Sequence, residues 1–204
     1  FDIVQLSDTQ CGVLVCDVMG HGVRAGLLTA MIRGVVEEMG ARAIDPVHVL
    51  AEINHSLVPI VEQIGQPVFA TTFFGVIDTA RHRLTYGNAG HPAPLVRHAR
   101  SEPIARLAPA DPEPAAGLLA EFAYTRHECE FHPGDLFLGY TDGVVEAANS
   151  AGTLFGEERL RALLTGARGL SGAELNERLL ADVKSFSGHA NFDDDVCLVA
   201  IEAR

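Results

Sequence analysis

Acidic side chains stand where apolar segments of this 204-residue sequence begin or end. Asp17 closes the run VLVCD before a glycine-rich turn, and Asp142 closes LFLGYTD before another glycine. Three further acids, Asp193, Asp194 and Asp195, open the last apolar segment. We expect these segments to be buried strands, whose ends project carboxylates from the edge of a sheet. Acids that are far apart in the sequence can therefore meet at one sheet edge.

Carboxylates that cluster in this way repel one another unless a cation is present. Their hard oxygen atoms suit Mg²⁺ or Mn²⁺, and no set of histidines and cysteines has the spacing of a zinc site. Two such ions about 3.5–4 Å apart can bind a phosphoryl group and activate a water molecule. Taken singly, each acid has a simpler explanation, because an aspartate before glycine is usually a turn residue and an acidic run is usually solvated.

Histidine occurs in two glycine-containing turns. Gly20-His21-Gly22 either makes only a strand-to-helix turn or exposes backbone N–H groups to an anion at the start of a helix. We interpret His91, in NAGHP, as a structural turn residue in preference to a catalytic base. The four cysteines form no C-x-x-C pair, which argues against a zinc knuckle or redox pair and favours buried thiols in a reducing cytoplasm.

Apolar patterns predict the elements that position these residues. Runs rich in β-forming residues predict strands over 11–18, 69–78, 83–89, 94–97, 122–131, 136–140 and 195–202. Helical spacing predicts helices over 24–39, 46–64, 156–164 and 171–186, with a possible kink at Pro59 and a Ser171–Glu174 capping box. The proline-rich stretch 102–117 indicates a loop or a sheet edge. Strands and helices come in separate runs with no dividing linker, so we predict one α+β domain over residues 1–204.

Composition and charge narrow the function classes. Apolar residues make up 48% and charged residues 21%, which is ordinary for a soluble globular protein. The net charge of −12 argues against nucleic acid as the main partner, since phosphate backbones attract lysine and arginine. The longest uncharged apolar stretch, 68–77, is about half the length of a membrane span, and no secretory signal is visible. We expect a cytoplasmic chain and, because its first residue is not methionine, a fragment of a longer protein.

Four motifs follow one another in a specific order along the chain. They are DVMGHG at 17–22, FATTFFGVID with LTYGNAGHPAPLV at 69–96, LFLGYTDGVVEAANSAGTLFGEERL at 136–160 and FDDDVCLVAIE at 192–202. Together they resemble the metal-dependent (PPM, type 2C-like) protein phosphatases, in particular the bacterial branch of the sporulation phosphatase SpoIIE and the stress phosphatase RsbU. The resemblance spans nearly the whole chain. It implies an α-β-β-α sandwich, in which two antiparallel sheets are flanked by helices.

The resemblance also implies a role for each candidate residue. Asp17 matches the aspartate that bridges two metal ions, and the backbone carbonyl of Val18 matches a neighbouring ligand. Asp142 matches the aspartate of the family's Thr/Ser-Asp-Gly motif. Asp194 matches the remaining ligand, and its two neighbours in the run Asp193–Asp195 are alternatives. These three aspartates are the catalytic candidates, and two Mn²⁺ or Mg²⁺ ions are the implied cofactors.

The sequence departs from the family at three points. The aspartate of the family's G-G-D segment, which helps to hold the second metal, would fall two residues before Phe1, so we expect a weak second site. Cys197 stands where threonine or serine is usual. Met19 stands where the eukaryotic members have a histidine. We therefore do not assign His21 as a general acid. We assign the whole turn Gly20–Gly22, His21 included, a structural role or a contact with substrate.

The implied reaction is hydrolysis of phosphoserine or phosphothreonine on a protein by a metal-activated water. The implied substrate is a phosphorylated regulator of the anti-anti-sigma (STAS-like) type, and an upstream sensor domain is expected. The helices over 24–39 and 46–64 would offer a contact for a regulatory domain or a homodimer. Two alternatives stay open: a pseudophosphatase that serves as a binding or dimerisation module, and a metal phosphoesterase for small molecules or nucleotides. The acidic charge and the lack of a lysine-containing phosphate loop weigh against a nucleotide enzyme.

Overall fold

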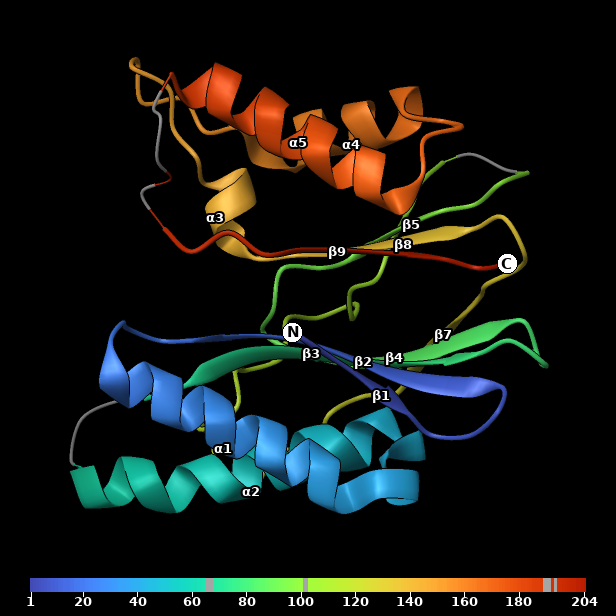
Figure 1. Ribbon diagram of the computed structural model, residues 1–204. Coiled ribbons are helices and arrows are strands. Elements are labelled where there is room, and N and C mark those ends of the chain that lie inside the picture. Colours follow the sequence, from blue (N-terminus) through green and yellow to red (C-terminus); the bar gives the residue numbers. More distant parts are fainter. Residues whose placement is uncertain (65–67, 101–102, 189–191, 193) are drawn as a thin grey trace. The chain divides into compact units, whose positions relative to one another are not determined.

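Each of the two sheets in this protein belongs to a unit of its own (Figure 1). The computed structural model describes residues 1–64, 68–100, 103–188, 192 and 194–204. The first unit comprises Phe1–Ala93 and Ala108–Phe131, and the second comprises Pro94–Leu107 and His132–Arg204. Both units combine one antiparallel sheet with helices, which confirms the predicted α+β class.

The first unit is built on a five-stranded antiparallel sheet in the order β1-β2-β3-β4-β7. Its strands are β1 Asp2–Gln5, β2 Gln10–Val18, β3 Ala70–Asp78, β4 Arg83–Ala89 and β7 His127–Glu130. Branched and aromatic residues favour the strand conformation in β2 and β3, and a turn over 79–82 joins β3 to β4 as the predicted hairpin. This sheet carries the first of the predicted site residues at the end of β2.

Two long helices cover one face of this sheet (Figure 1). α1 Val23–Met39 leads through the short 3-10 helix η1 Gly40–Ile44 into α2 Pro46–Ile64. The helices bury apolar side chains against alternate residues of β2 and β3, in a core that includes Leu14, Val18, Leu28, Ile32, Val36, Leu50, Ile53, Leu57, Phe74 and Val76. Because side chains alternate along a strand, Asp17 lies on the face of the sheet opposite to these helices.

The second unit is built on a four-stranded antiparallel sheet in the order β6-β5-β8-β9. Its strands are β5 Leu95–Arg97, β6 Ala105–Arg106, β8 Leu136–Tyr140 and β9 Leu198–Glu202. The short helix α3 Asp142–Val145 follows β8 almost at once, and α4 Gly156–Gly166 and α5 Gly172–Ser187 come before β9. The predicted capping box is present at α5, where Ser171 and Glu174 bond reciprocally.

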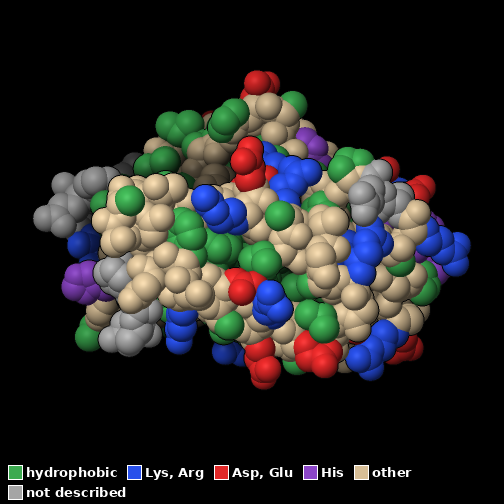
Figure 2. Space-filling view, turned by 90° about the horizontal axis from the view of Figure 1, so that it is seen from above, with side chains coloured by type: hydrophobic (Ala, Val, Ile, Leu, Met, Phe, Trp, Pro, Cys, Tyr) green, Lys and Arg blue, Asp and Glu red, His purple; other side chains and the backbone are tan. Residues whose placement is uncertain are grey.

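Helices α4 and α5 pack on one face of the second sheet (Figure 1). Their shared core includes Leu95, Leu136, Leu138, Tyr140, Val144, Leu160, Leu164, Leu175, Leu179 and Val183. Seen from the side of these helices, acidic and basic side chains are interspersed (Figure 2). Ion pairs there join Arg106 to Glu157 at 2.9 Å and Arg178 to Asp182 at 2.8 Å.

Every predicted strand and helix segment overlaps an observed one, with differences at the ends. β7 is shorter than the predicted 122–131, and β9 begins at Leu198 rather than Asp195 because the backbone groups of Asp195 and Cys197 bond to Thr141 instead. β1, η1 and α3 were not predicted, and β6 lies in the stretch 102–117 that was expected to be a loop or a sheet edge. The helix predicted over 46–64 was expected to end at Gly65, which lies outside the described residues. No helix in the described ranges is both long and apolar enough to cross a membrane.

Candidate active site

The end of β2 carries the candidate ligands of the first unit. Met19 N donates to Phe69 O at 2.9 Å, so these two residues form a hydrogen-bonded pair of the β2–β3 ladder. Hydrogen-bonded and non-hydrogen-bonded pairs alternate along an antiparallel ladder. The pair Val18–Ala70 is therefore not hydrogen-bonded, and the pair Asp17–Thr71 is. The Val18 carbonyl is therefore directed away from β3, towards the side of β2 where β1 pairs. β1 does not reach Val18, because its pairing with β2 ends at Leu14. This geometry leaves the Val18 carbonyl outside the β2–β3 ladder, as its predicted role as a ligand requires.

A glycine turn leads from β2 into α1. Gly20 and Gly22 have φ angles of 92° and 84°, which residues with a Cβ rarely adopt, so the turn predicted at Gly20-His21-Gly22 is confirmed. Gly22 is the N-cap of α1 and makes no side-chain capping bond, and the first turn holds no acidic residue. The helix dipole at this end would therefore favour a bound anion.

Cys16 precedes Asp17 on β2. Burial raises the pKa of the Cys16 thiol to about 11, the charge of Asp17 adds to the rise, and a hydrogen bond from the Thr72 hydroxyl opposes it. Without a metal ion the thiol stays protonated at neutral pH, so it is a poor nucleophile. The sequence analysis expected buried thiols, but all four cysteines are of intermediate exposure.

His91 lies on the same face of the first sheet as Asp17 through its contact with Thr71. Its Nδ1 is 3.0 Å from the Thr71 hydroxyl, and the ring is 5% exposed. The Asn88 side chain fixes the turn, because its Oδ1 accepts from His91 N at 2.7 Å and its Nδ2 donates to His91 O at 3.0 Å. Gly90 has a φ of 69°, and a Cβ there would lie 3.0 Å from Ala115 N. The motif NAGH is thus a rigid turn, as its sequence suggested.

The end of β8 carries the candidate ligands of the second unit. The Thr141 hydroxyl donates to Asp195 O at 3.0 Å and accepts from Cys197 N at 2.9 Å. Thr141 N also donates to Cys197 O at 3.2 Å. One threonine therefore joins two motifs that lie 54 residues apart in the sequence. The residues before and after it, Tyr140 and Asp142, are fixed next to the acidic run.

Gly143 shows how closely these two motifs approach. A Cβ at this position would lie 2.6 Å from Asp195 O, a distance that real Cβ atoms do not reach, so only glycine fits. The Asp142-Gly143 pair is therefore needed for packing as well as for any chemistry. Asp142 begins α3, a helix that the sequence interpretation of a simple turn missed.

Asp142 carries an oxygen atom that suits a cation. Its Oδ1 is buried and accepts no hydrogen bond from the part of the chain that the structure describes. A buried carboxylate oxygen without a partner costs free energy, and binding of a hard cation would remove that cost. The residue present at this position therefore fits the divalent metal that the resemblance implies.

The acidic run is only partly described. Asp194 is exposed, and its Oδ1 accepts from Asp195 N at 2.7 Å. Asp195 is also exposed, and its carbonyl is used by Thr141. Asp193 lies outside the described residues. Within the described ranges, no group of three or more His, Cys, Asp or Glu side chains is placed to hold an ion. The ligand set proposed from the sequence therefore stays a prediction.

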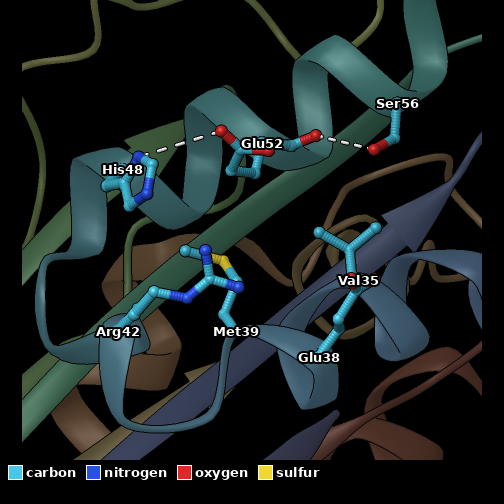
Figure 3. Close-up of a pocket in the computed structure, with 7 residues that line it drawn as sticks. All are labelled: Val35, Glu38, Met39, Arg42, His48, Glu52 and Ser56. Atoms are coloured by element: carbon cyan, nitrogen blue, oxygen red, sulfur yellow. Dashed lines mark hydrogen bonds and ion pairs between the residues drawn. The ribbon is translucent and has the colours of Figure 1, made fainter.

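A cavity of about 250 Å³ lies between α1, η1 and α2 of the first unit (Figure 3). It is lined by Val35, Glu38, Met39, Arg42, His48, Glu52 and Ser56. His48 Nδ1 is 3.9 Å from a Glu52 carboxylate oxygen, a weak pair of exposed groups. None of the predicted site residues lines this cavity, which is on the helix side of the first sheet.

Comparison with known proteins confirms the recognised family. The family model of stage II sporulation protein E (SpoIIE) matches residues 7–204. The chain belongs to the SpoIIE family. A curated relative, phosphoserine phosphatase RsbP of Bacillus subtilis (strain 168), is 26% identical to this SpoIIE-family chain over 212 residues and 98% of its length. The chain spans only 47% of RsbP, about half of that protein.

Solved structures confirm the fold of this SpoIIE-family chain. The SiaA-PP2C domain of Pseudomonas aeruginosa matches 100% of the chain, and the chain matches 79% of that domain, with a TM-score of 0.80 and 22% identity. The catalytic domain of the serine threonine protein phosphatase PstP, described in complex with two manganese ions, matches 100% of this chain and 91% of its own length with a TM-score of 0.66 and 14% identity. Because both structures are less than 25% identical to the chain, their similarity establishes the fold alone.

Sequence reasoning missed the residues that support the predicted ligands. Thr141 was quoted only as part of a motif, and Thr71 was not singled out at all. A threonine between the apolar strand β8 and Asp142 was the available signal for the first. The second needed the β2–β3 register, which no local pattern in the sequence encodes.

Proposed function

We propose that the chain hydrolyses phosphoserine or phosphothreonine on a protein and depends on divalent cations. Membership of the SpoIIE family supports this, and so does the name phosphoserine phosphatase carried by RsbP, a relative across 98% of the chain. The two manganese ions described for PstP support the choice of cation class. The single observation that carries the proposal is the buried Asp142 oxygen that lacks a hydrogen bond among the described residues.

The proposed ligands are the carboxylates of Asp17, Asp142 and Asp194 and the carbonyl of Val18, for two Mn²⁺ or Mg²⁺ ions. When bound, such ions neutralise phosphate charge and lower the pKa of a water molecule enough for it to attack phosphorus at neutral pH. The protein's own contribution is to hold these oxygens in place. Thr141 does so for Asp142 through three hydrogen bonds to the Asp195–Cys197 segment.

The turn Gly20–Gly22 is proposed as a phosphate contact. Its support is the N-terminus of α1, where positive φ angles expose backbone N–H groups and no side chain caps the helix. His21 is exposed in this turn, where it can reach a bound phosphoprotein without taking part in proton transfer.

The proposed natural substrate is a phosphorylated regulatory protein of the anti-anti-sigma (STAS-like) type. Because the chain spans about half of RsbP, an upstream sensor domain is part of the proposal. We further propose a cytoplasmic location, and α1 and α2 as the contact for a regulatory domain or a second copy. A phosphorylated STAS-domain protein that stays phosphorylated when mixed with an active enzyme would contradict the proposed substrate class.

The first test is Mn²⁺-dependent hydrolysis of para-nitrophenyl phosphate, which needs no knowledge of the partner. It uses the chain as given and the same chain extended upstream through the G-G-D segment. We expect Asp17→Asn and Asp142→Asn each to lose activity by at least about 100-fold, since even outer-shell partners of a metal contribute 10–100-fold. Single substitutions of Asp193, Asp194 and Asp195 by asparagine identify the ligand in the acidic run.

A matched control is Asp182→Asn, which removes a carboxylate from α5 whose ion pair with Arg178 lies at the surface. It should keep full activity. Folded protein that binds Mn²⁺ without turnover in the extended chain would indicate an inactive state that awaits its regulatory domain. A pseudophosphatase that serves as a binding module has no need of tight Mn²⁺ binding. Folded protein that binds no Mn²⁺ would overturn the proposed function.

A further inference from the structure

We propose that His91 is a positioning residue of the active site, which acts through Thr71 to orient the carboxylate of Asp17. The inference rests on the proposed function, because it assigns His91 a role in cation binding by Asp17. Neither the ring of His91 nor the hydroxyl of Thr71 is offered as a metal ligand. Their effect is on the geometry of the carboxylate that is.

The β2–β3 register places Thr71 next to Asp17. The two residues lie directly opposite in a hydrogen-bonded pair, so their Cα atoms are about 5.5 Å apart and their side chains share one face. This is the face opposite to the apolar core formed with α1 and α2. Thr71 therefore places a hydroxyl directly across from Asp17 on the same face of the sheet.

The hydrogen bond to His91 determines what the Thr71 hydroxyl can do. A hydroxyl has one proton to donate, whereas an ionised carboxylate can only accept. When His91 Nδ1 carries the proton and donates to Thr71 Oγ1 across their 3.0 Å contact, the Thr71 proton is left for a carboxylate. The chain of donation then runs from His91 to Thr71 to Asp17, and it holds the carboxylate in one orientation.

The turn that carries His91 is built to hold its ring still. Two hydrogen bonds from the Asn88 side chain clamp the His91 backbone at 2.7 and 3.0 Å. Gly90 allows the turn to pack against the Glu113–Ala115 segment, where a Cβ would meet Ala115 N at 3.0 Å. His91 is 5% exposed, and the hydrogen bonds from Asn88 fix its backbone. The imidazole is therefore poorly placed to exchange protons with solvent but well placed to hold the Thr71 hydroxyl.

The test measures Mn²⁺ binding by isothermal titration calorimetry to the full chain and to matched variants. We expect Thr71→Val, which keeps the shape and removes the hydroxyl, to raise the Kd by roughly 10–100-fold. Thr71→Ser should restore most of the affinity. His91→Phe should weaken binding to a similar extent, and His91→Asn, which can place a donor near the position of Nδ1, should recover part of it.

Two comparisons separate positioning from a purely structural role. The double variant Thr71→Val/His91→Phe should bind Mn²⁺ about as weakly as either single variant, because both act on one chain of hydrogen bonds. His55→Phe, a change of an exposed histidine on α2, should leave the Kd unchanged. Thermal unfolding without metal reports whether each variant is folded at the temperature of the titration.

The outcomes are distinct. An unchanged Kd in folded Thr71→Val, with tight binding by the unmodified chain, would overturn the inference and leave the proposed function intact. Equal losses in Thr71→Val and Thr71→Ser would also overturn it, since the hydroxyl would then be irrelevant. No Mn²⁺ binding by the unmodified chain would overturn both the inference and the proposed function.

Discussion

Thr141 uses its hydroxyl both as a donor and as an acceptor, in a side chain that is 4% exposed. Thr141→Val keeps the shape but leaves Asp195 O and Cys197 N without that partner. We expect a loss of about 1–3 kcal/mol in the free energy of unfolding, because buried polar groups without partners are costly. Urea unfolding of the metal-free protein measures it.

Thr141→Ser is the control for this prediction. It keeps the hydroxyl and removes only a methyl group, so it should be clearly more stable than Thr141→Val. Equal stability of the two variants would show that the hydrogen bonds to the Asp195–Cys197 segment contribute little.

The candidate site was predictable at the level of individual acids and not at the level of their supports. Asp17 and Asp142 could be found because each ends an apolar run before glycine. The role of Gly143 in packing could not, because it depends on the Asp195 carbonyl 52 residues later, where a Cβ would approach to 2.6 Å. Contacts of this kind depend on the pairing of distant segments, which local sequence patterns do not specify.

At the scale of the elements, one buried carboxylate, that of Asp135, connects the end of β5 to the turn before β8. Asp135 accepts from Ala99 N at 2.8 Å, from His132 N at 3.0 Å and from His98 Nδ1 at 2.8 Å. Burial alone would raise the pKa of Asp135, but these hydrogen bonds outweigh it and the pKa is lowered. The ionised carboxylate therefore stabilises the second unit.

The sign of the pH dependence follows from that lowered pKa. The folded pKa lies below the unfolded value of about 3.9, so the stabilisation is present above about pH 4 and is lost as the pH falls further. We expect Asp135→Asn to destabilise the protein by about 2–3 kcal/mol at pH 7, and by less as the pH falls towards 3. Urea unfolding across pH 3–7 measures the difference.

Asp182→Asn in the same unit is the matched control, because its ion pair with Arg178 lies on an exposed helix surface. Such pairs contribute about 0.3–0.5 kcal/mol, so this variant should follow the unmodified protein at every pH. A destabilisation by Asp135→Asn that does not shrink with falling pH would contradict the assignment of charge to that carboxylate.

The elements themselves were largely predictable, since β2, β3, β4 and β8 are short apolar runs bounded by turn residues. The strand ends were less so. Tyr124 and Thr125 were expected in a strand, but Tyr124 is buried outside it and Thr125 N donates to Glu113. β1 escaped prediction because an edge strand of four residues has too few side chains to show a period.

For the whole molecule, the surplus of 27 acids over 15 lysines and arginines makes the response to Mn²⁺ informative. A cation that binds only the folded chain should stabilise it by about 2.7 kcal/mol at 100 times its Kd. We expect the melting temperature to rise with Mn²⁺ in the unmodified chain and to stay constant in Asp142→Asn. Differential scanning calorimetry measures both.

Sodium chloride at the same ionic strength separates this effect from general screening of the negative charge. Salt alone should shift both proteins by the same small amount. A rise with Mn²⁺ that is as large in Asp142→Asn as in the unmodified chain would show that the ion acts through the overall charge rather than through a site.

The two units share the chain in alternating pieces, with passages after Ala93, Leu107 and Phe131. On the ribosome, β4 therefore emerges well before β7, its neighbour in the sheet, and both β5 and β6 are made in between. No single cut in the gene separates one unit whole from the other. A cut after Ala93 would part β7 from the rest of the first sheet, and a cut after Phe131 would part β5 and β6 from β8 and β9. A single recombination event anywhere from Ala93 to Phe131 therefore breaks at least one of the two sheets.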